Sequence, residues 1–487
     1  MRLLSELLGD VRVLNNIELN PQIRALEYDS RKIESGDCFF AVKGTASDGH
    51  NFIASAIERG AHAVVCQTLP EELNPNVAYI LVEDSNIAMA AMAAAFYGHP
   101  SRELKLVGVT GTNGKTTTAT LLYDMVMAMG HNAGLISTVV YRIGSRSIHS
   151  THTTPDSIRL NQMMRQMIDE GCEYCFMEVS SHAAAQHRID YLHFAGALFS
   201  NLTHDHLDYH GTYKEYIRAK KSFFDALDKS AWAVVNIDDR NGEVMVQNTR
   251  AKVYRLSLRS MADFHTRIIE LMTDGMHLDL AGHDIWVKFT GRFNAYNLTT
   301  VYAAATLLGI DPIEVLTTLS TLSPVSGRFE TIVAKDRTMA VVDYAHTPDA
   351  LENVLQTIEE VRTPQQQLFV VCGCGGDRDS SKRPEMARIA LRYATTAIFT
   401  SDNPRTEDPE AILNDMIAGV GDAANYLRIS DRREAIRTAS MLAAAGDIIL
   451  VAGKGHEDYQ IIGTEKHHFD DREQVREFFD ALRKKSN

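Results

Sequence analysis

The feature that most constrains the fold of this chain is a glycine-rich loop between a predicted strand and a predicted helix. The run Leu–Lys–Leu–Val–Gly–Val at 104–109 is short and apolar, which is typical of a buried strand. After the loop, apolar residues recur with the spacing of one helix face, at Leu121, Leu122, Met125, Val126 and Met129. A strand, a glycine-rich loop and a helix in this order predict an α/β fold with a parallel sheet.

The loop has the composition of a phosphate-binding loop. Its backbone N–H groups and the helix N-terminus attract nucleotide phosphates. Lys115 can then reach the β- and γ-phosphates, and the Thr116 hydroxyl can bind Mg²⁺. The strict P-loop spacing needs glycine where this chain has Val109, so a glycine-rich turn without a ligand is the alternative. We expect ATP to bind at Gly111, Thr112, Asn113, Gly114, Lys115, Thr116 and Thr117.

The length of the chain and its alternation of apolar runs with helical patterns indicate several domains. A chain of 487 residues is too long for one hydrophobic core. Apolar runs alternate with turns and helical patterns, and further strands are predicted at 174–179, 195–200, 231–237, 339–343, 367–373, 397–401 and 448–453. Turn-rich stretches at 98–101 and 323–328 mark candidate boundaries. We therefore predict three domains, at residues 1–95, 96–327 and 328–487.

Charge and cysteine content exclude some classes of function. The chain has 49 Lys and Arg against 63 Asp and Glu, a net charge of −14, which argues against a general nucleic-acid binder. No window approaches the ~20 apolar residues of a membrane-spanning helix, and the first residues do not resemble a signal peptide. Of six cysteines, only Cys172 and Cys175 have zinc or redox spacing, and no second pair accompanies them. We expect reduced thiols, a cytoplasmic location, no nucleic-acid partner and no membrane insertion.

Several motifs together resemble one family. Gly–Val–Thr–Gly–Thr–Asn–Gly–Lys–Thr–Thr at 108–117 is similar to the P-loop of the Mur ligases, a variant that folylpolyglutamate synthetases share. Glu–Val–Ser–Ser–His at 178–182, His–Asp–His–Leu–Asp at 204–208 and Gly–Arg–Phe–Glu at 327–330 extend the resemblance over nearly the whole chain. It implies an N-terminal uridine-nucleotide-binding domain, a central P-loop ATPase-type domain with a parallel sheet, and a C-terminal Rossmann-like domain.

The resemblance assigns the catalytic and metal-binding residues. Glu178 and His206 take positions that bind Mg²⁺ together with Thr116. Lys220 takes the position of a carbamylated lysine that holds a second Mg²⁺, and Lys115 completes the catalytic set. Without the family, the histidine-rich segment 204–210 would also suit zinc, and a lysine on a polar helix would indicate a solvated face. The family's further ATP-binding positions fall on Asn297, Arg328 and Asp343.

Two substrate sites also follow from the resemblance. The site for the UDP-linked substrate falls on Ser30, Thr45, Ala46, Ser47, Thr153, Thr154, Ser180, Gln186 and Arg188. The site for the amino acid falls on Arg378, Asp402, Asn403, Pro404, Arg405, Gly453 and Glu457. The motif Asp–Asn–Pro–Arg at 402–405 separates diaminopimelate-adding members of the family from lysine-adding ones. The guanidinium of Arg405 can bind the second carboxylate of diaminopimelate bidentately, and Glu457 is a partner for its distal ammonium.

The reaction that the resemblance implies is ATP-dependent ligation in peptidoglycan precursor synthesis. Meso-diaminopimelate would be joined to UDP-N-acetylmuramoyl-L-alanyl-D-glutamate through an acyl phosphate, by a monomer that binds small molecules only. The nearest competing hypothesis is a lysine-adding ligase, which Arg405 disfavours. The sequence also leaves open a relative of the folylpolyglutamate synthetases and an ATP-regulated binding protein without ligase activity. A metallohydrolase built on His204, His206 and His210 would leave the P-loop unexplained.

Overall fold

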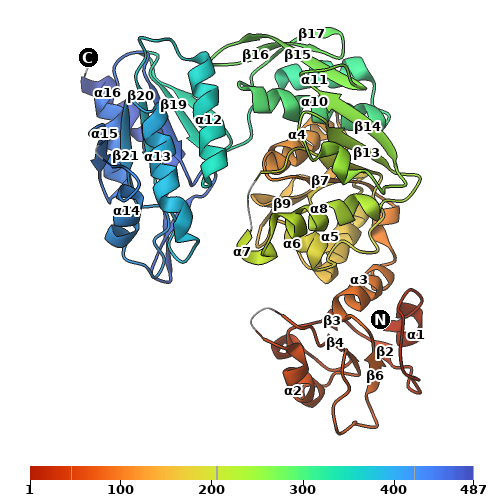
Figure 1. Ribbon diagram of the computed structural model, residues 1–487. Helices are drawn as coiled ribbons and strands as arrows, with labels where there is room; N and C mark the ends of the chain where they lie inside the picture. The colour runs from red at the N-terminus through yellow and green to blue at the C-terminus, as the bar shows by residue number, and fades with distance from the viewer. Residues whose placement is uncertain (45–46, 204–206, 422, 486–487) are drawn as a thin grey trace. The chain divides into compact units, whose positions relative to one another are not determined.

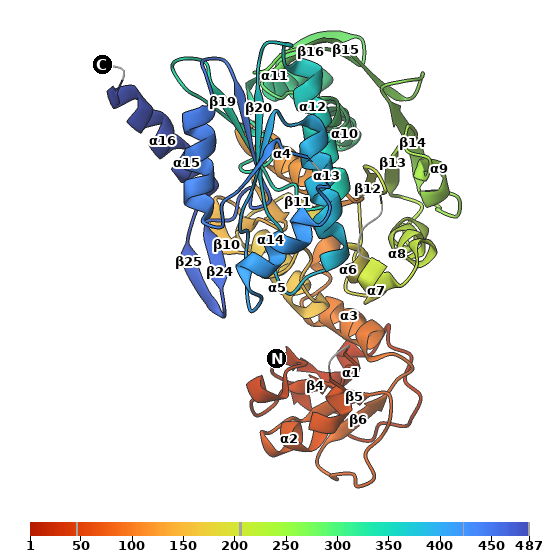
Figure 2. The ribbon, with the colours of Figure 1, turned by 60° about the vertical axis from the view of Figure 1, so that its left-hand side comes forward.

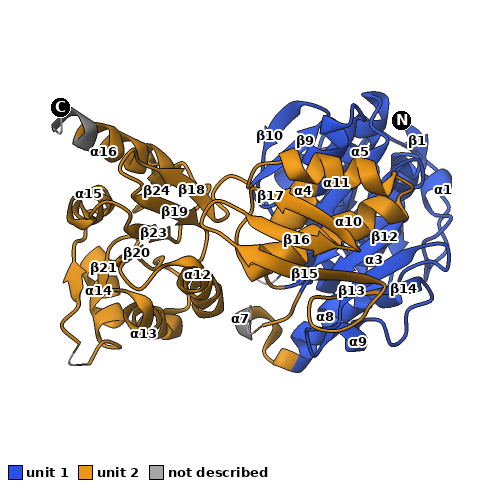
Figure 3. Cartoon of the chain, turned by 90° about the horizontal axis from the view of Figure 1, so that it is seen from above, with its two compact units in different colours: residues 1–111, 122–200, 214–254 blue, residues 112–121, 201–213, 255–487 orange. Residues whose placement is uncertain are grey.

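The computed structural model describes residues 1–44, 47–203, 207–421 and 423–485. Contacts between residues divide the chain into two compact units, which Figure 3 shows in different colours. Unit 1 comprises residues 1–111, 122–200 and 214–254, and unit 2 comprises residues 112–121, 201–213 and 255–487. The glycine-rich loop therefore begins in unit 1 and continues in unit 2.

The N-terminal part of unit 1 is a small parallel sheet in the order β3–β4–β5–β6. Its strands are Leu26–Glu27, Cys38–Phe40, Ala63–Cys66 and Ala78–Leu81. Helix α2 (Ile53–Glu58) packs on one face, and helices α1 (Leu4–Leu7) and α3 (Ser85–Phe96) pack on the other (Figure 2). Two short strands, β1 (Arg2–Leu3) and β2 (Gln22–Ile23), pair antiparallel. Apolar side chains alternate along the four strands, so both faces of the sheet are buried.

The second sheet of unit 1 has the order β10–β9–β8–β11–β7–β12–β13–β14. Its strands, in chain order, are Lys105–Thr110, Ala133–Ile136, Val140–Ile143, Arg146–His149, Tyr174–Glu178, Gly196–Phe199, Trp232–Asn236 and Lys252–Ser257. Strands β8, β11, β7, β12 and β13 are parallel, so their carboxyl ends lie along one edge, where ligands bind in sheets of this kind. The further helices of unit 1 are the second half of α4 (Lys115–Ala128), α5 (Ser157–Asp169), α6 (Ser181–Ala185), α8 (Tyr213–Asp225) and α9 (Gly242–Met245). The first half of α4 and the short helix α7 (Leu207–His210) belong to unit 2.

A glycine inside β7 allows close packing just before the glycine-rich loop. A Cβ atom at Gly108 would lie 2.6 Å from Cζ of Phe223 in α8 and 2.9 Å from Cε1 of Phe194. The two aromatic rings contact each other edge to face, with centroids 4.8 Å apart. Glycine therefore lets α8 and its lysines approach the strand that leads into the loop.

Unit 2 contains an antiparallel sheet that was not predicted from the sequence. Its strands are β15 (Phe264–Leu271), β16 (Met276–Leu280) and β17 (His283–Val287), and the end of β14 pairs in parallel with the start of β15. Helix α10 (Arg292–Leu307) contacts β15, and helix α11 (Pro312–Thr321) contacts β17. Several β15 side chains are only partly buried, so its apolar signal in the sequence is weak.

The C-terminal part of unit 2 is a doubly wound sheet in the order β18–β19–β23–β20–β21–β22. Its strands, in chain order, are Glu330–Val333, Met339–Asp343, Leu368–Cys372, Thr396–Phe399, Tyr426–Arg428 and Ile448–Ala452. All but β18 are parallel. One face packs against α12 (Pro348–Val361), α13 (Arg383–Tyr393) and α14 (Pro409–Ile417), and the other against α15 (Arg432–Leu442) and α16 (Asp471–Lys485) (Figure 1).

A hairpin of β24 (Tyr459–Ile462) and β25 (Glu465–His468) follows β23 and was not predicted. The predicted α/β fold with parallel sheets is confirmed, and each strand predicted from an apolar run is present within two residues of its expected bounds. Among the helices of the described residues, none combines the length and the apolar character that crossing a bilayer requires.

Candidate active site

The glycine-rich loop is fixed by the segment 201–203 of unit 2. The backbone N–H of Thr112 donates to the carbonyl of Asn201 at 2.8 Å. The Asn201 amide accepts from the N–H of Asn113 at 3.0 Å and donates to its carbonyl at 3.1 Å. The N–H of Thr203 donates to the Thr112 hydroxyl at 3.0 Å. These contacts fix the loop ahead of the N-terminus of α4, and a helix N-terminus attracts anions.

Arg328 contacts this loop within unit 2, although it lies 212 positions after Thr116 in the chain. Lys115 Nζ donates to the carbonyl of Thr112 at 2.8 Å. Arg328 NH2 donates to the Thr116 hydroxyl at 3.2 Å, and its guanidinium lies 4.7 Å from the ring centre of Tyr344. Two cations therefore lie beside the glycine-rich loop, a charge arrangement that suits a polyphosphate, and the roles of Lys115 and Arg328 in binding ATP stay predictions.

Asp343 ends β19 and holds the turn that carries Arg328. Its carboxylate is 9% exposed and accepts from the backbone N–H of Phe329 at 2.7 Å. Burial raises the pKa of Asp343 to about 6, while the charge of Arg328 and the N–H groups of Phe329 and Ala345 oppose the rise. Asp343 therefore orients the arginine through the backbone as well as through its charge.

Asn297, predicted near ATP, lies inside α10. The helix begins after Gly291, whose φ of +92° and lack of a Cβ allow contact with α12, since a Cβ would lie 2.4 Å from Cγ2 of Thr357. The Asn297 amide is buried and donates to Asn294 Oδ1 at 3.1 Å. Its predicted role in binding ATP stays a prediction.

Glu178 is the last residue of β11 and lies in unit 1 at the carboxyl edge of the parallel sheet. Its carboxylate is fully buried. Oε1 accepts from the backbone N–H of Thr138 at 2.7 Å, and Oε2 accepts from the Thr138 hydroxyl at 3.2 Å. Thr138 follows the neighbouring strand β8 and was not among the predicted site residues, although its place after a buried strand was a usable signal.

The surroundings of Glu178 fit a divalent cation. Among the described residues no Lys, Arg or His lies within ion-pair distance of this buried carboxylate, and an isolated buried charge is unfavourable. Carboxylate and hydroxyl oxygens are the donors that Mg²⁺ prefers. In the described ranges no three His, Cys, Asp or Glu side chains converge as a ready metal cluster. The predicted ligand His206 lies outside the described residues.

Lys220 lies on the inner face of α8 in unit 1. The side chain is 2% exposed, and Nζ donates to the carbonyl of Gly111 at 2.7 Å. Nζ also lies 4.9 Å from the ring centre of Tyr216. The solvated-face interpretation of this lysine is therefore wrong, because the ammonium is buried at the start of the glycine-rich loop.

The residues assigned to the UDP-linked substrate gather around Thr154 in unit 1. Its hydroxyl donates to the carbonyl of Glu178 at 2.7 Å and accepts from the N–H of Ser180 at 3.1 Å. Arg188 NH1 donates to the carbonyl of Thr154 at 2.7 Å, and Nε donates to Gln186 Oε1 at 3.0 Å. Four predicted substrate contacts thus form one polar group beside the buried carboxylate.

The other described residues assigned to the UDP-linked substrate are not hydrogen-bonded to Thr154. The hydroxyl oxygens of Thr153 and Thr138 lie 3.1 Å apart, and because the Thr138 proton is donated to Glu178, the Thr153 hydroxyl is the donor of this pair. Ser30 lies in a short 3₁₀ helix, and the carbonyl of Ser47 accepts from the N–H of Gly44 at 2.9 Å. Burial raises the pKa of Tyr28, which follows β3, and the charge of Arg188 opposes the rise. Two other predicted contacts, Thr45 and Ala46, lie outside the described residues.

The residues assigned to the amino acid lie at the carboxyl ends of three parallel strands in unit 2. Strands β20, β21 and β23 lead directly into segments 373–379, 400–405 and 453–457. Close backbone approach joins them, since a Cβ at Gly376 would lie 1.9 Å from the carbonyl oxygen of Pro404. Gly453 has a φ of +118°, and a Cβ there would lie 2.5 Å from Asp402 Oδ2.

Three buried or partly buried side chains form a hydrogen-bonded cluster at the carboxyl ends of these strands. Asn403 Nδ2 donates to Glu457 Oε2 at 2.9 Å, and Lys454 Nζ donates to the same oxygen at 3.0 Å. Lys454 Nζ also donates to Asn403 Oδ1 at 3.3 Å. Lys454 was not predicted, because in the motif Gly–Lys–Gly–His–Glu it has no pattern that distinguishes it from a solvated loop lysine.

Arg405 is held in an unusual backbone conformation by the β24–β25 hairpin. Its φ is +52°, its N–H donates to the carbonyl of Ile461 at 3.1 Å, and its carbonyl accepts from the N–H of Gly463 at 2.7 Å. Arg405 NH1 donates to the carbonyl of Gly376 at 2.8 Å, and no described residue accepts from Nε or NH2. Those nitrogens are therefore available to a carboxylate. Arg378, the other predicted arginine, is exposed on the neighbouring segment.

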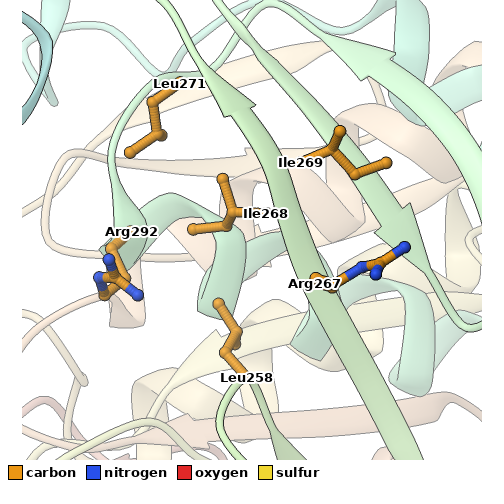
Figure 4. A pocket seen from close by; sticks show the side chains of 6 residues that line it. All are labelled: Leu258, Arg267, Ile268, Ile269, Leu271 and Arg292. Carbon is orange, nitrogen blue, oxygen red and sulfur yellow. The ribbon is translucent and has the colours of Figure 1, made fainter.

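A cavity of about 340 Å³ in unit 2 lies apart from the predicted site residues, none of which lines it (Figure 4). Its lining residues are Leu258, Arg267, Ile268, Ile269, Leu271 and Arg292. Both arginines have carboxylate partners, Arg267 with Asp279 at 3.5 Å and Arg292 with Glu360 at 3.6 Å. We assign it no role in catalysis.

Comparisons with known proteins identify the relatives of this chain. The Mur ligase middle domain matches residues 109–305, the glutamate ligase domain of Mur ligases matches residues 327–455, and a Mur ligase family catalytic domain matches residues 22–97. UDP-N-acetylmuramoyl-L-alanyl-D-glutamate–2,6-diaminopimelate ligase of Phocaeicola vulgatus is 54% identical, over 98% of this chain and 97% of the relative. The protein of the same name from Geobacillus kaustophilus is 45% identical, over 93% of this chain and 94% of the relative.

Solved structures agree with the sequence relatives. A diaminopimelate ligase of the same name is 33% identical, with a TM-score of 0.68 and 95% of each chain covered. The MurF ligase from Thermotoga maritima in complex with ADP is 19% identical, with a TM-score of 0.62, and covers 95% of this chain and 99% of that chain. The latter likeness concerns the fold alone.

Proposed function

The chain belongs to the Mur ligase family, and from this premise we propose that it joins meso-diaminopimelate to UDP-N-acetylmuramoyl-L-alanyl-D-glutamate with ATP as co-substrate. The enzyme is an amide-bond-forming ligase that releases ADP and phosphate, and its product is a peptidoglycan precursor. Relatives that carry the name of this reaction match over almost their whole length, which supports the same reaction here.

The observation that carries the proposed substrate is the set of charges at the carboxyl edge of β20, β21 and β23. Arg405 offers nitrogens to a carboxylate, and Glu457 offers a carboxylate to an ammonium. A substrate with a distal carboxylate and a distal ammonium on one carbon suits this pair. Lysine has no distal carboxylate, so it would leave the Arg405 guanidinium without its partner, and a ligand that cannot satisfy a site's polar groups binds poorly.

The proposed reaction requires positioning and charge stabilisation more than a nucleophilic side chain. The loop at 111–117 holds the phosphates of ATP, and Lys115 and Arg328 stabilise negative charge on the transferring phosphoryl group. An oxygen of the D-glutamyl γ-carboxylate attacks the γ-phosphorus, ADP leaves, and an acyl phosphate results. The amine of diaminopimelate then attacks the acyl carbon, the C–O bond to phosphate breaks, and the amine loses a proton.

Mg²⁺ fits the residues that we propose to hold it. Thr116, Glu178 and His206 would bind one Mg²⁺, and a carbamylated Lys220 would bind a second. The buried Glu178 carboxylate, which has no cationic partner among the described residues, supports the assignment. The ion would neutralise phosphate charge when bound. Carbamylation would convert the buried ammonium of Lys220 into an anion, which suits a buried residue whose task is to bind a cation.

Further expectations remain part of the proposal. We propose the boundaries 1–95, 96–327 and 328–487 for the UDP-substrate, ATP-binding and amino-acid-binding domains. Six cysteines, all buried and free, agree with a reducing cytoplasm, where ATP and nucleotide-linked precursors occur. We expect a monomer, because each proposed ligand is a small molecule.

The experiment that tests the function is phosphate release by the purified protein. ATP, Mg²⁺ and UDP-N-acetylmuramoyl-L-alanyl-D-glutamate are supplied with meso-diaminopimelate or with L-lysine. Release that requires both the UDP-dipeptide and diaminopimelate supports the proposal, and Arg405→Ala should abolish the preference for diaminopimelate over lysine. Equal release with lysine would replace the proposed substrate, and release that requires neither acceptor nor amino acid would exclude a ligase.

A further inference from the structure

Lys454 follows strand β23 at the proposed amino-acid site. Its side-chain exposure is 0%, and that of its partner Glu457 is 13%. The ammonium lies 3.0 Å from Glu457 Oε2, 3.3 Å from Asn403 Oδ1 and 5.3 Å from the ring centre of Tyr459. Burial of a lysine is unfavourable unless it is paired and hydrogen-bonded, and here both conditions are met within the proposed substrate site.

The contacts of Lys454 fix the orientation of the Asn403 amide. Asn403 Oδ1 accepts from Lys454 and from the backbone N–H of Ile461, the latter at 2.9 Å. Because neither donor can bond to the amide nitrogen, Nδ2 must face Glu457, to which it donates at 2.9 Å. A flipped amide would place two donors against Nδ2 and leave a carbonyl oxygen against a carboxylate.

Lys454 also fixes the Glu457 carboxylate. Oε2 accepts from Lys454 at 3.0 Å and from Asn403 at 2.9 Å. Hydrogen-bonded groups of this kind act as one unit, so the loss of a single buried cation displaces the others.

We propose that Lys454 is a positioning residue of the amino-acid site: it holds Glu457 and Asn403 in the orientation that receives the distal end of the substrate. The inference rests on the proposed function and deepens it. Lys454 need not touch the substrate, because it acts through two side chains that do. The alternative is that Lys454 only stabilises the C-terminal fold.

The test is the kinetics of Lys454→Met, which keeps the length of the side chain and removes its charge. Phosphate release is measured while meso-diaminopimelate, ATP and the UDP-dipeptide are varied in turn. We expect KM for diaminopimelate to rise about 10- to 100-fold, since small displacements of positioning groups have effects of this size. KM for ATP and for the UDP-dipeptide should stay within about twofold of the wild-type values.

The matched control is Lys466→Met in β25. Lys466 also lies over the Tyr459 ring, at 3.5 Å, but is exposed, and no bond to Glu457 or Asn403 is among its contacts. It should leave all three KM values unchanged. If Lys454→Met does not fold, Lys454→Gln is measured instead, because its amide keeps a donor for Glu457 while the charge is removed.

The outcomes separate the inference from the function on which it rests. A selective rise in KM for diaminopimelate supports the positioning role. A lower melting temperature or lower kcat with an unchanged KM for diaminopimelate would overturn it, as would an equal rise in all three KM values. Failure of the wild-type protein to release phosphate with diaminopimelate would instead overturn the proposed function.

Discussion

A buried ion pair behind the amino-acid site gives a prediction with a definite magnitude. Arg432 and Asp471 are both fully buried, with N–O distances of 2.7 and 2.8 Å. Asp471→Ala would leave the guanidinium buried without its counter-charge, and removal of one partner of such a pair costs about 3–5 kcal/mol. The same guanidinium donates to the carbonyls of Ala452 at 3.0 Å and Ser401 at 3.4 Å. We therefore expect a large loss of stability that also loosens the ends of β21 and β23.

Urea unfolding of the full-length protein measures this loss. The free energy of unfolding is measured for the transition of the C-terminal part in three proteins: wild type, Asp471→Ala and the double variant Arg432→Met with Asp471→Ala. The three values can be compared when the m-values of the transitions are equal. The double variant removes the uncompensated charge and should recover much of the stability that the single variant loses. A loss below about 1 kcal/mol in Asp471→Ala would refute this reasoning, because the pair would then contribute no more to stability than an exposed ion pair does.

Two further predictions concern the conformation and the titration of the site. Gly453→Ala should raise KM for diaminopimelate about tenfold, because its Cβ would lie 2.5 Å from Asp402 Oδ2; Gly446→Ala, also at positive φ but with open space around it, is the control, and equal KM values in both variants would contradict the prediction. Asp343 has its pKa raised from 3.8 to about 6 by burial, so the folded chain holds this proton to higher pH than the unfolded chain does. Its contribution to stability is present below pH 3.8 and lost as pH rises through about 6, by about 3 kcal/mol. Relative to Asp343→Asn, the wild-type protein should lose stability between pH 4 and pH 7 in urea titrations, and a constant difference would contradict the assignment.

The parts of the fold that could be predicted are those with a strong local signal. Buried parallel strands read as continuous apolar runs, and the polar residues that follow them, such as Glu178 and Asp402, mark the binding edge without any knowledge of distant contacts. The strands β15 to β17 alternate weakly and the β24–β25 hairpin is exposed, so neither produced a signal of comparable strength.

The supporting contacts of the site could not be predicted because they join residues far apart in the chain. Lys454 contacts Asn403 across 51 positions, and Thr138 contacts Glu178 across 40. From the sequence, Glu457 was expected to pair with the substrate ammonium, and its contact with Lys454 was not foreseen. Composition and motif spacing contain no information about such pairs, which depend on the order of strands in the sheet.

The most direct test is the mass of the product when two amino acids compete. The wild-type protein is supplied with ATP, Mg²⁺, UDP-N-acetylmuramoyl-L-alanyl-D-glutamate and equal amounts of meso-diaminopimelate and L-lysine, and the UDP-linked products are separated and identified by mass. We predict a UDP-tripeptide that contains diaminopimelate, formed with one phosphate released per product. A lysine-containing tripeptide as the main product, or phosphate release without any tripeptide, would contradict the proposed ligase.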